Sequence, residues 1–413
     1  MFRLLFGEDA TVVRDRSFQL LVLANVLPPL GTALMSPILG SLIDPLGASP
    51  ASIGLIISAF TAPAVVMIPI AGGIADRAGR KPVILTGLVC FGLGGTAIAL
   101  TTDFRVVLGL RLLQGIGFAA LTPIIITSIG DLYTGSAQAT AQGLRFTGSG
   151  LTQTVFPLAG GVLVGLAWQY PFLLHAVAFP VAAVVYVWFD EPAPADSAGA
   201  GRSLSAQVRA IWGLVTQRRA AAMVIARGTP NIAWIGFLTY NSIVVVDILG
   251  GTPAQAGLLA ALGSLSYAAS ATQAGRISAV FDSQLSPLIV ANVALAGGTS
   301  AIFLARSLTA AYAGVVVMGA GFGVVLSLYR SIISEMAPDD LRGGLVSLGE
   351  GNGRAASTIT PALLGGAIAL GTPVVGFESA VQSAGVGLSV LAAAVGIGCL
   401  VVLHTAPPIR TDN

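Results

Sequence analysis

Apolar stretches of about twenty or more residues recur along this chain, and polar residues gather in the short segments between them. An α-helix of about twenty apolar residues is long enough to cross the roughly 30 Å hydrocarbon core of a bilayer. The pattern therefore predicts an all-α integral membrane protein with twelve transmembrane helices. We expect these helices near residues 18–43, 51–75, 82–101, 105–130, 139–166, 171–189, 220–247, 253–279, 287–305, 309–334, 341–370 and 379–403.

The longest polar stretch divides the predicted helices into two sets of six. It predicts an N-terminal half at residues 1–189, a linker at 190–219 and a C-terminal half at 220–413. An internal repeat supports this division, because Gln114-Gly115-Ile116-Gly117-Phe118 is echoed 204 residues later by Met318-Gly319-Ala320-Gly321-Phe322. Such repeats are typical of membrane proteins built from two similar halves. Within the linker, residues 203–218 are either an amphipathic surface helix or part of a flexible connection.

Basic residues are distributed unequally between the two predicted sides of the membrane. One side carries only Arg105 and Arg306. Because Lys and Arg concentrate in cytoplasmic loops, the side richer in basic residues is predicted to be cytoplasmic. Both termini and the linker are predicted to lie on this side. The protein is expected in the plasma membrane. The residues on that side are Arg3, Arg14, Arg16, Arg77, Arg80, Lys81, Arg202, Arg209, Arg218, Arg219, Arg276, Arg342 and Arg410.

The composition argues against a soluble protein, and the lack of catalytic motifs argues against an enzyme. Hydrophobic residues make up 55% of the chain and charged residues 9%, so lipid must be the solvent for much of its surface. Cys90 and Cys399 lie in apolar runs and are interpreted as small hydrophobic residues. His175 and His404 have no ligand-like neighbours, so no metal site is predicted. The sequence contains no phosphate-binding loop and no nucleophile with a base, so we expect no cofactor, no catalysis and no nucleic-acid partner.

The densest group of charges lies in the segment Gly72–Pro82, between two predicted spans. Its spacing, G-x-x-x-D-R-x-G-R-K, resembles the signature loop between helices 2 and 3 of the major facilitator superfamily of membrane transporters. The resemblance implies two six-helix halves and a conformational latch. In this latch Asp76 would pair across the halves with the start of helix 11 and stabilise the state closed to the cytoplasm. The latch residues would be Gly72, Asp76, Arg77, Gly79, Arg80 and Lys81.

A second motif, Arg111-Leu112-Leu113-Gln114-Gly115-Ile116-Gly117, resembles the R-x-x-Q-G-x-G pattern of proton-coupled members of this superfamily. An arginine within a span costs about 2.5–3.5 kcal/mol on insertion scales. We therefore expect Arg111 and Gln114 to face a cavity and take part in coupling; the alternative is that Arg111 extends outward to the interface. Residues Thr152–Gly161 resemble an antiporter pattern only in part, because Thr152 and Phe156 replace two glycines.

Glu350 and Arg354 lie near the middle of predicted helix 11 with i, i+4 spacing. This spacing predicts a pair on one helix face, which either binds protons or substrate or is a static ion pair. Arg145 is a further candidate for a buried cation, whereas Arg227 is expected near the cytoplasmic interface. Together the arginines make an anionic substrate as plausible as a lipophilic cation. The remaining candidates for substrate hydrogen bonds are Asn25, Asn241, Gln273 and Asn352.

In its motifs the chain is most similar to the drug:proton antiporter-like members with twelve helices. The resemblance implies a monomeric secondary transporter that moves a small organic molecule across the lipid bilayer by alternating access, as efflux coupled to protons. One alternative is a uniporter or exchanger for a metabolite, including an anionic one. An alternative of another class is a membrane sensor or scaffold that transports nothing.

Overall fold

The computed structural model describes residues 10–191, 212–283, 285–336 and 341–407. The N-terminal half contains three short helices before its long ones, α2 (Ala10–Arg14), α3 (Arg16–Asn25) and α4 (Leu27–Ala33), with the 3₁₀ turn η2 (Gly40–Leu42) after them. The longer helices are α5 (Leu55–Ala78), α6 (Arg80–Ala97), α7 (Phe104–Leu132) and α8 (Gly135–Val164). The half ends with α9 (Tyr170–Leu173), the 3₁₀ turn η4 (Leu174–Val177) and α10 (Ala178–Trp188).

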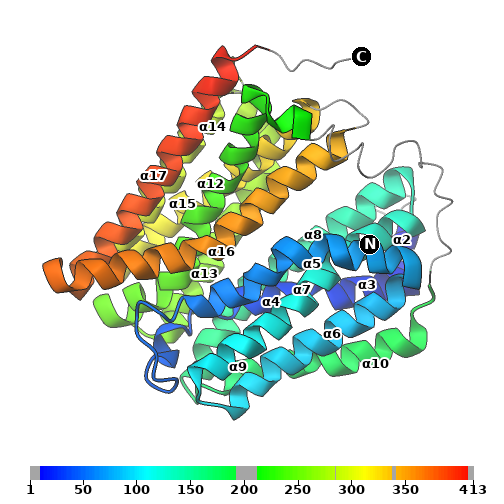
Figure 1. The fold of residues 1–413 in the computed structure, drawn as a ribbon, viewed down its shortest axis with the longest axis horizontal. Helices are drawn as coiled ribbons and strands as arrows, with labels where there is room; N and C mark the ends of the chain where they lie inside the picture. Colours follow the sequence, from blue (N-terminus) through cyan, green and yellow to red (C-terminus); the bar gives the residue numbers. More distant parts are fainter. Residues whose placement is uncertain (1–9, 192–211, 284, 337–340, 408–413) are drawn as a thin grey trace.

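The C-terminal half consists of longer and more regular elements. Helix α12 (Arg218–Ser242) continues into a π-helical turn, η5 (Ile243–Ile248). It is followed by α13 (Pro253–Ser278), α14 (Leu285–Phe303), α15 (Leu308–Met336), α16 (Arg342–Val375) and α17 (Phe377–Thr405). In Figure 1 this half, coloured green to red, lies beside the blue to green N-terminal half as a second bundle.

The predicted all-α membrane fold is confirmed, and except in the first span the helices lie where the apolar pattern placed them, with boundaries that differ by a few residues. Nine helices of the described residues are long and apolar enough to cross a membrane. The other three predicted spans are the broken segment α3–α4 and the helices α8 and α13, which carry more polar residues. Most of the predicted linker and surface helix lies outside the described residues.

The first predicted span is interrupted instead of forming one helix. Pro28 and Pro29 follow the cap residue Val26, and a proline has no N–H to donate to the helix ladder. Beyond Ala33 the chain continues through turns up to Gly54. In these turns the N–H of Met35 bonds to the carbonyl of Thr32, so the Gly31 carbonyl is left for a side-chain donor.

The internal repeat reflects repeated helix packing. A Cβ atom on Gly115 of α7 would lie only 2.2 Å from the carbonyl oxygen of Phe60 in α5. At the equivalent position of the second half, a Cβ atom on Gly319 of α15 would lie 2.5 Å from the carbonyl oxygen of Gly263 in α13. Glycine is therefore required at both positions for the same reason, which is a close approach of two helix backbones.

The halves meet along a contact region that we call the seam. It joins α5 to α16, α8 to α13 and η2 to η5. Glycines allow direct backbone contact there: Cβ atoms on Gly161, Gly257 and Gly365 would lie 2.3, 2.4 and 2.0 Å from carbonyl oxygens of the other half. The hydrogen bonds across the seam are Asn241 to Ser36 (3.0 Å), Tyr240 to the Pro50 carbonyl (3.2 Å), Ser58 to the Thr358 carbonyl (2.7 Å) and Thr358 to Thr61 (3.1 Å).

The seam lies toward one end of the molecule. Residues 36–61 precede or begin α5, and residues 240–257 join α12 to α13, so both belong to the same end of the bundle. We call the opposite end, where α10 ends and α12 begins, the linker end. In Figure 1 α16 (orange) runs along the side of the C-terminal half that faces the N-terminal half.

Candidate functional site

Four charged side chains gather in the part of the C-terminal half nearer the linker end: Arg227 of α12, Arg330 of α15, and Glu350 and Arg354 of α16. Glu350 Oε1 accepts hydrogen bonds from Arg227 Nη2 and from Arg330 Nε, each at 2.8 Å. Arg227 is 2% exposed, whereas the side chains of Arg330 and Glu350 are 44% and 33% exposed. The charged cluster therefore ties three helices together and remains accessible from one side.

The predicted pairing of Glu350 with Arg354 is wrong in this structure. The guanidinium of Arg354 has no hydrogen bond or ion pair with any described residue, and it lies over the Phe118 ring of α7 at 5.6 Å. The i, i+4 spacing does place both residues on one face of α16, but Glu350 finds its partners on α12 and α15. Arg227 also departs from the prediction, because it is buried and bonds to Glu350 instead of extending outward.

Arg330 is a functional candidate that sequence reasoning missed. It lies inside the predicted span 309–334, and an arginine within a span is itself a signal for a polar interior partner. In the structure it provides half of the hydrogen bonding that Glu350 receives from arginines. The rule applied to Arg111 and Arg145 would have identified it.

The N-terminal half brings a further cation toward this cluster. Arg145 of α8 is 4% exposed and donates from Nη1 to Asn25 Oδ1 at 3.3 Å and from Nε to Gln142 Oε1 at 2.9 Å. Asn25 in turn donates to Ser149 Oγ at 2.7 Å. Arg330 repels Arg145 electrostatically across the two halves. The predicted residues Arg145 and Asn25 thus form one group that faces the charged cluster.

One face of α16 runs from the charged cluster into the seam. Thr358 of this face is bound to Ser58 and Thr61 of α5. One helical turn toward the linker end Arg354 lies over an aromatic ring of the N-terminal half, and after one more turn Glu350 is partly exposed. The i, i+4 spacing of these residues keeps them on one line along the helix. The closed seam and the open charged cluster are therefore neighbouring parts of one helix surface.

Arg111 lies inside the N-terminal half and is 0% exposed. Its guanidinium donates to the carbonyls of Gly31 (2.7 Å) and Ile56 (3.1 Å) and to Gln114 Oε1 (2.5 Å), and it lies over the Phe60 ring at 4.5 Å. The residue therefore points inward, but toward backbone carbonyls and not into a cavity. It ties α4, α5 and α7 together, and the broken first span supplies one of its acceptors.

At the linker end, Arg80 links two carboxylates. It donates from Nη1 to Asp76 Oδ1 at 2.9 Å and from Nε to Asp131 Oδ2 at 3.0 Å. The neighbouring Tyr133 hydroxyl donates to Asp15 Oδ2 at 2.5 Å. Burial and this carboxylate raise the pKa of Tyr133, so the hydroxyl remains a donor. Helices α3, α5, α6 and α7 are thereby joined at this end.

The start of α6 is capped by a residue from the end of α10. The Glu191 carboxylate accepts hydrogen bonds from the backbone N–H groups of Arg80 and Lys81, the latter at 3.0 Å. A carboxylate at this position also interacts favourably with the helix dipole. Gly79 has φ +95°, and a Cβ atom there would lie 2.8 Å from Glu191 Oε1. Sequence analysis missed Asp131 and Glu191, although both are acids at the same predicted membrane end as the basic loop.

The predicted contact of Asp76 with the start of α16 is replaced here by a contact within the N-terminal half. The Asp76 side chain is 68% exposed and its ion-pair partner among the described residues is Arg80. Arg77 donates to the Gly73 carbonyl at 3.2 Å, and a Cβ atom on Gly72 would meet nothing within 4 Å. A latch across the halves stays a prediction for a conformation in which the linker end is closed.

Three predicted polar candidates do not join the charged cluster. Asn241 bonds across the seam, and Gln273 is exposed and accepts from Arg276 at 2.9 Å. Asn352 donates to the carbonyl of Val224 at 2.8 Å, which places its amide against the backbone of α12. In this conformation these side chains have structural partners.

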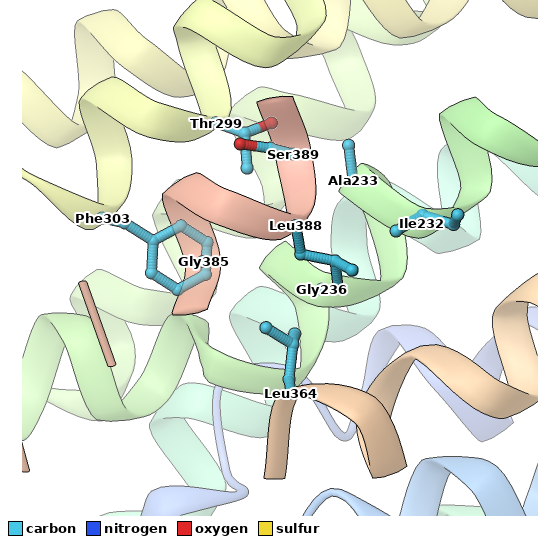
Figure 2. Close-up of a pocket in the computed structure, with 9 residues that line it drawn as sticks. All are labelled: Ile232, Ala233, Gly236, Thr299, Phe303, Leu364, Gly385, Leu388 and Ser389. Atoms are coloured by element: carbon cyan, nitrogen blue, oxygen red, sulfur yellow. The ribbon is translucent and has the colours of Figure 1, made fainter. Parts of the chain in front are cut away.

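A small pocket lies elsewhere in the C-terminal half, between α12, α14, α16 and α17 (Figure 2). Its polar groups are the hydroxyls of Thr299 and Ser389, which already donate to the carbonyls of Leu295 and Val386. Because the lining carries no charge and no free donor, we assign it to helix packing. The residues that line it are Ile232, Ala233, Gly236, Thr299, Phe303, Leu364, Gly385, Leu388 and Ser389.

Comparison with known proteins gives relatives among transporters. The chain is 33% identical over 150 residues to the bacillibactin exporter of Bacillus subtilis (strain 168), a match that covers 35% of this chain and 37% of that protein. It is 26% identical over 179 residues to multidrug resistance protein 2 of the same organism, covering 43% and 45% of the two chains. The matched regions thus span less than half the length of these curated relatives.

Solved structures share the fold over nearly the whole chain. A bacterial homologue of the human lysosomal transporter Spinster, in an inward-facing and occupied conformation, superposes with a TM-score of 0.81 at 17% identity, covering 97% of this chain and 98% of that one. A D-xylose-proton symporter gives a TM-score of 0.73 at 13% identity, with 95% and 98% covered. The family model described as Major Facilitator Superfamily matches residues 21–246, which is more than half of the chain. The chain therefore belongs to the major facilitator superfamily.

Proposed function

We propose that this protein is a secondary transporter that exports a small organic molecule by alternating access, with protons as the coupling ion. The observation that carries the proposal is the face of α16, where seam contacts at Thr358 lie directly beside the partly exposed cluster of Arg354 and Glu350. The names of the relatives, an exporter and a multidrug resistance protein, support the export direction.

In the proposed cycle, the described conformation is open at the linker end and closed at the seam. The excess of Arg and Lys in the loops of the linker end supports its assignment to the cytoplasm. Breaking the seam and closing the linker end would expose the charged cluster to the other side, and the latch predicted at Asp76 would then form. Rigid-body rocking of two similar halves is the motion that such repeats permit.

Glu350 is the proposed proton site. In this conformation its carboxylate accepts from Arg227 and Arg330, which come from different helices. Both arginines donate to the same oxygen, Oε1, and protonation of the carboxylate would remove the negative charge that holds α16 to α12 and α15. Proton binding would thereby depend on the conformation, which is the requirement for coupling.

The test is a pH-sensitive dye inside proteoliposomes that contain the purified protein, screened with cationic, neutral and anionic compounds. We expect a compound-dependent proton flux that Glu350→Gln abolishes. The matched control is Glu335→Gln, because Glu335 accepts from Ser331 on its own helix and lies at the linker end of α15. Equal proton flux in Glu350→Gln would remove Glu350 from the coupling mechanism.

A second candidate is an exchanger or uniporter that moves its substrate without protons. The double pairing of Glu350 with arginines favours it, because a carboxylate bound to two arginines from different helices can act as a fixed structural tie. Compound exchange without any change in internal pH would support this candidate. If no compound crosses the membrane in the proton-flux assay or in the exchange assay, the sensor or scaffold alternative would be favoured.

A further inference from the structure

Arg227 is buried at the charged cluster with part of its guanidinium unused. Its Nη2 atom donates to Glu350, but the buried Nε and Nη1 atoms have no hydrogen-bond partner. The residue is 2% exposed. Buried donors on a charged group are costly when unpaired. Two such donors on one side chain therefore indicate a partner that the protein itself does not supply.

A second donor points to the same place. The position that a Cβ atom of Gly353 would occupy lies 3.3 Å from Arg227 Nη1 and 2.6 Å from Asn231 Nδ2. Arg227 and Asn231 are one turn apart on α12, so both project from one face of that helix. On α16 the neighbouring residue Arg354 carries a guanidinium whose donors are unused by the described residues. Arg227 and Asn231 thus offer N–H groups beside Gly353, and Arg354 adds a guanidinium that interacts electrostatically with Arg227.

The charges of this region are unbalanced. Arg227, Arg330 and Arg354 all interact electrostatically with the single carboxylate of Glu350. Their sum leaves two positive charges without a counter-ion, and Arg145 adds a further cation from the other half. An excess of positive charge within a membrane protein is stabilised by a bound anion.

An aromatic surface adjoins these donors. Tyr267 of α13 lies near Arg227 and Arg330, and it is only partly buried. Its ring meets the Phe322 ring edge-on at 5.1 Å, and Trp234 stacks on Phe322 at 4.7 Å. Trp234 lies one turn beyond Asn231 on α12. A ligand with an apolar or aromatic body next to its charged group would find partners for both parts.

We propose that the transported molecule is an organic anion, and that its carboxylate or phosphate binds at Arg227, Asn231 and Arg354 with its apolar body toward Tyr267. This assignment rests on the proposed transport function and names its substrate class. Glu350 stays with Arg330 and Arg227 Nη2, and the anion takes the donors that are free. Arginine forks are well suited to carboxylate and phosphate oxygens.

The test is ligand-dependent thermal stabilisation of the purified full-length protein. The probes are benzoate and phenyl phosphate as anions, with benzamide and benzylamine as neutral and cationic compounds of similar size. We expect the anions alone to raise the melting temperature of the wild type. Their apparent affinity should fall at least about tenfold in Arg354→Gln and in Asn231→Ala. The control Arg306→Gln, which changes an exposed arginine outside the cluster, should respond like the wild type.

Stabilisation by benzylamine or benzamide equal to that of the anions would overturn the assignment, and so would the absence of any effect of both anions. An unchanged anion response in Arg354→Gln would also overturn it. These outcomes are separable from a failure of the proposed function, because proteoliposome flux is measured independently. If only cations or neutral compounds cross the membrane, the proposed transport function is retained and the proposed anion site is rejected. Anion binding without flux of any compound would retain the site and reject transport.

Discussion

At the scale of single residues, the charged side chains inside spans could be predicted from the sequence, but their partners could not. Glu350, Arg354 and Arg145 stand out because ionisable residues in apolar helices are rare. Whether Glu350 meets Arg354 or Arg227 depends on how α16 is rotated against α12 and α15, which is a property of the tertiary packing. Spacing within one helix could not distinguish between these partners.

Gly79 is predicted to be required by both its conformation and its neighbour. Its φ of +95° is a region that other residues rarely adopt, and a Cβ atom would collide with the Glu191 carboxylate. We expect Gly79→Ala to destabilise the protein by about 1–3 kcal/mol. Thermal unfolding in detergent would measure this loss. Gly143→Ala is the control, since nothing lies within 4 Å of a Cβ there. Equal melting temperatures of the two variants would contradict the prediction.

At the scale of helices, the apolar pattern predicted nearly every element, because a span must be long and apolar whatever its neighbours are. The exception is the first span, where Pro28 and Pro29 interrupt the helix. Their positions were visible in the sequence, but a proline within a membrane helix can also be tolerated as a kink. The structure shows that the interruption is used, because the free Gly31 carbonyl accepts from Arg111.

The repeated glycines predict that helix contacts in the two halves respond alike to substitution. In Gly319→Ala the new methyl group would meet the Gly263 carbonyl, which belongs to a rigid helix backbone. We expect a loss of about 1–3 kcal/mol in stability and less folded protein by size-exclusion chromatography. The control Gly297→Ala on α14 meets nothing within 4 Å and should behave like the wild type. A normal yield and melting temperature of Gly319→Ala would refute the close approach.

At the scale of the whole molecule, the two-half organisation followed from the repeat, whereas the conformation did not. A sequence specifies both ends of an alternating-access cycle at once, so it cannot indicate which end is closed. This explains why Asp76 pairs with Arg80 here although the resemblance implied a contact across the halves. The seam residues Ser58 and Thr358 carry no motif that would have identified them in advance.

A reversible crosslink of the seam should stop transport. The hydroxyls of Thr61 and Thr358 are 3.1 Å apart, so cysteines at these positions are close enough for a disulfide. In a background with Cys90 and Cys399 replaced by alanine, we expect oxidised Thr61→Cys/Thr358→Cys to lose compound flux and reduction to restore it. Each single cysteine variant should keep its flux under oxidation. Undiminished flux through fully crosslinked protein would exclude opening at the seam.

The backbone contacts at Gly161, Gly257 and Gly365 have a consequence for the speed of the cycle. Where a glycine rests on a carbonyl oxygen, separation requires no side chain to leave one rotamer for another. At these three contacts the halves can therefore separate without a side-chain rearrangement, whereas the side-chain hydrogen bonds elsewhere in the seam have to break. A larger residue at any of these glycines would add a side chain that has to rearrange whenever the halves separate or meet. The turnover rate should then become more sensitive to temperature than it is in the wild type.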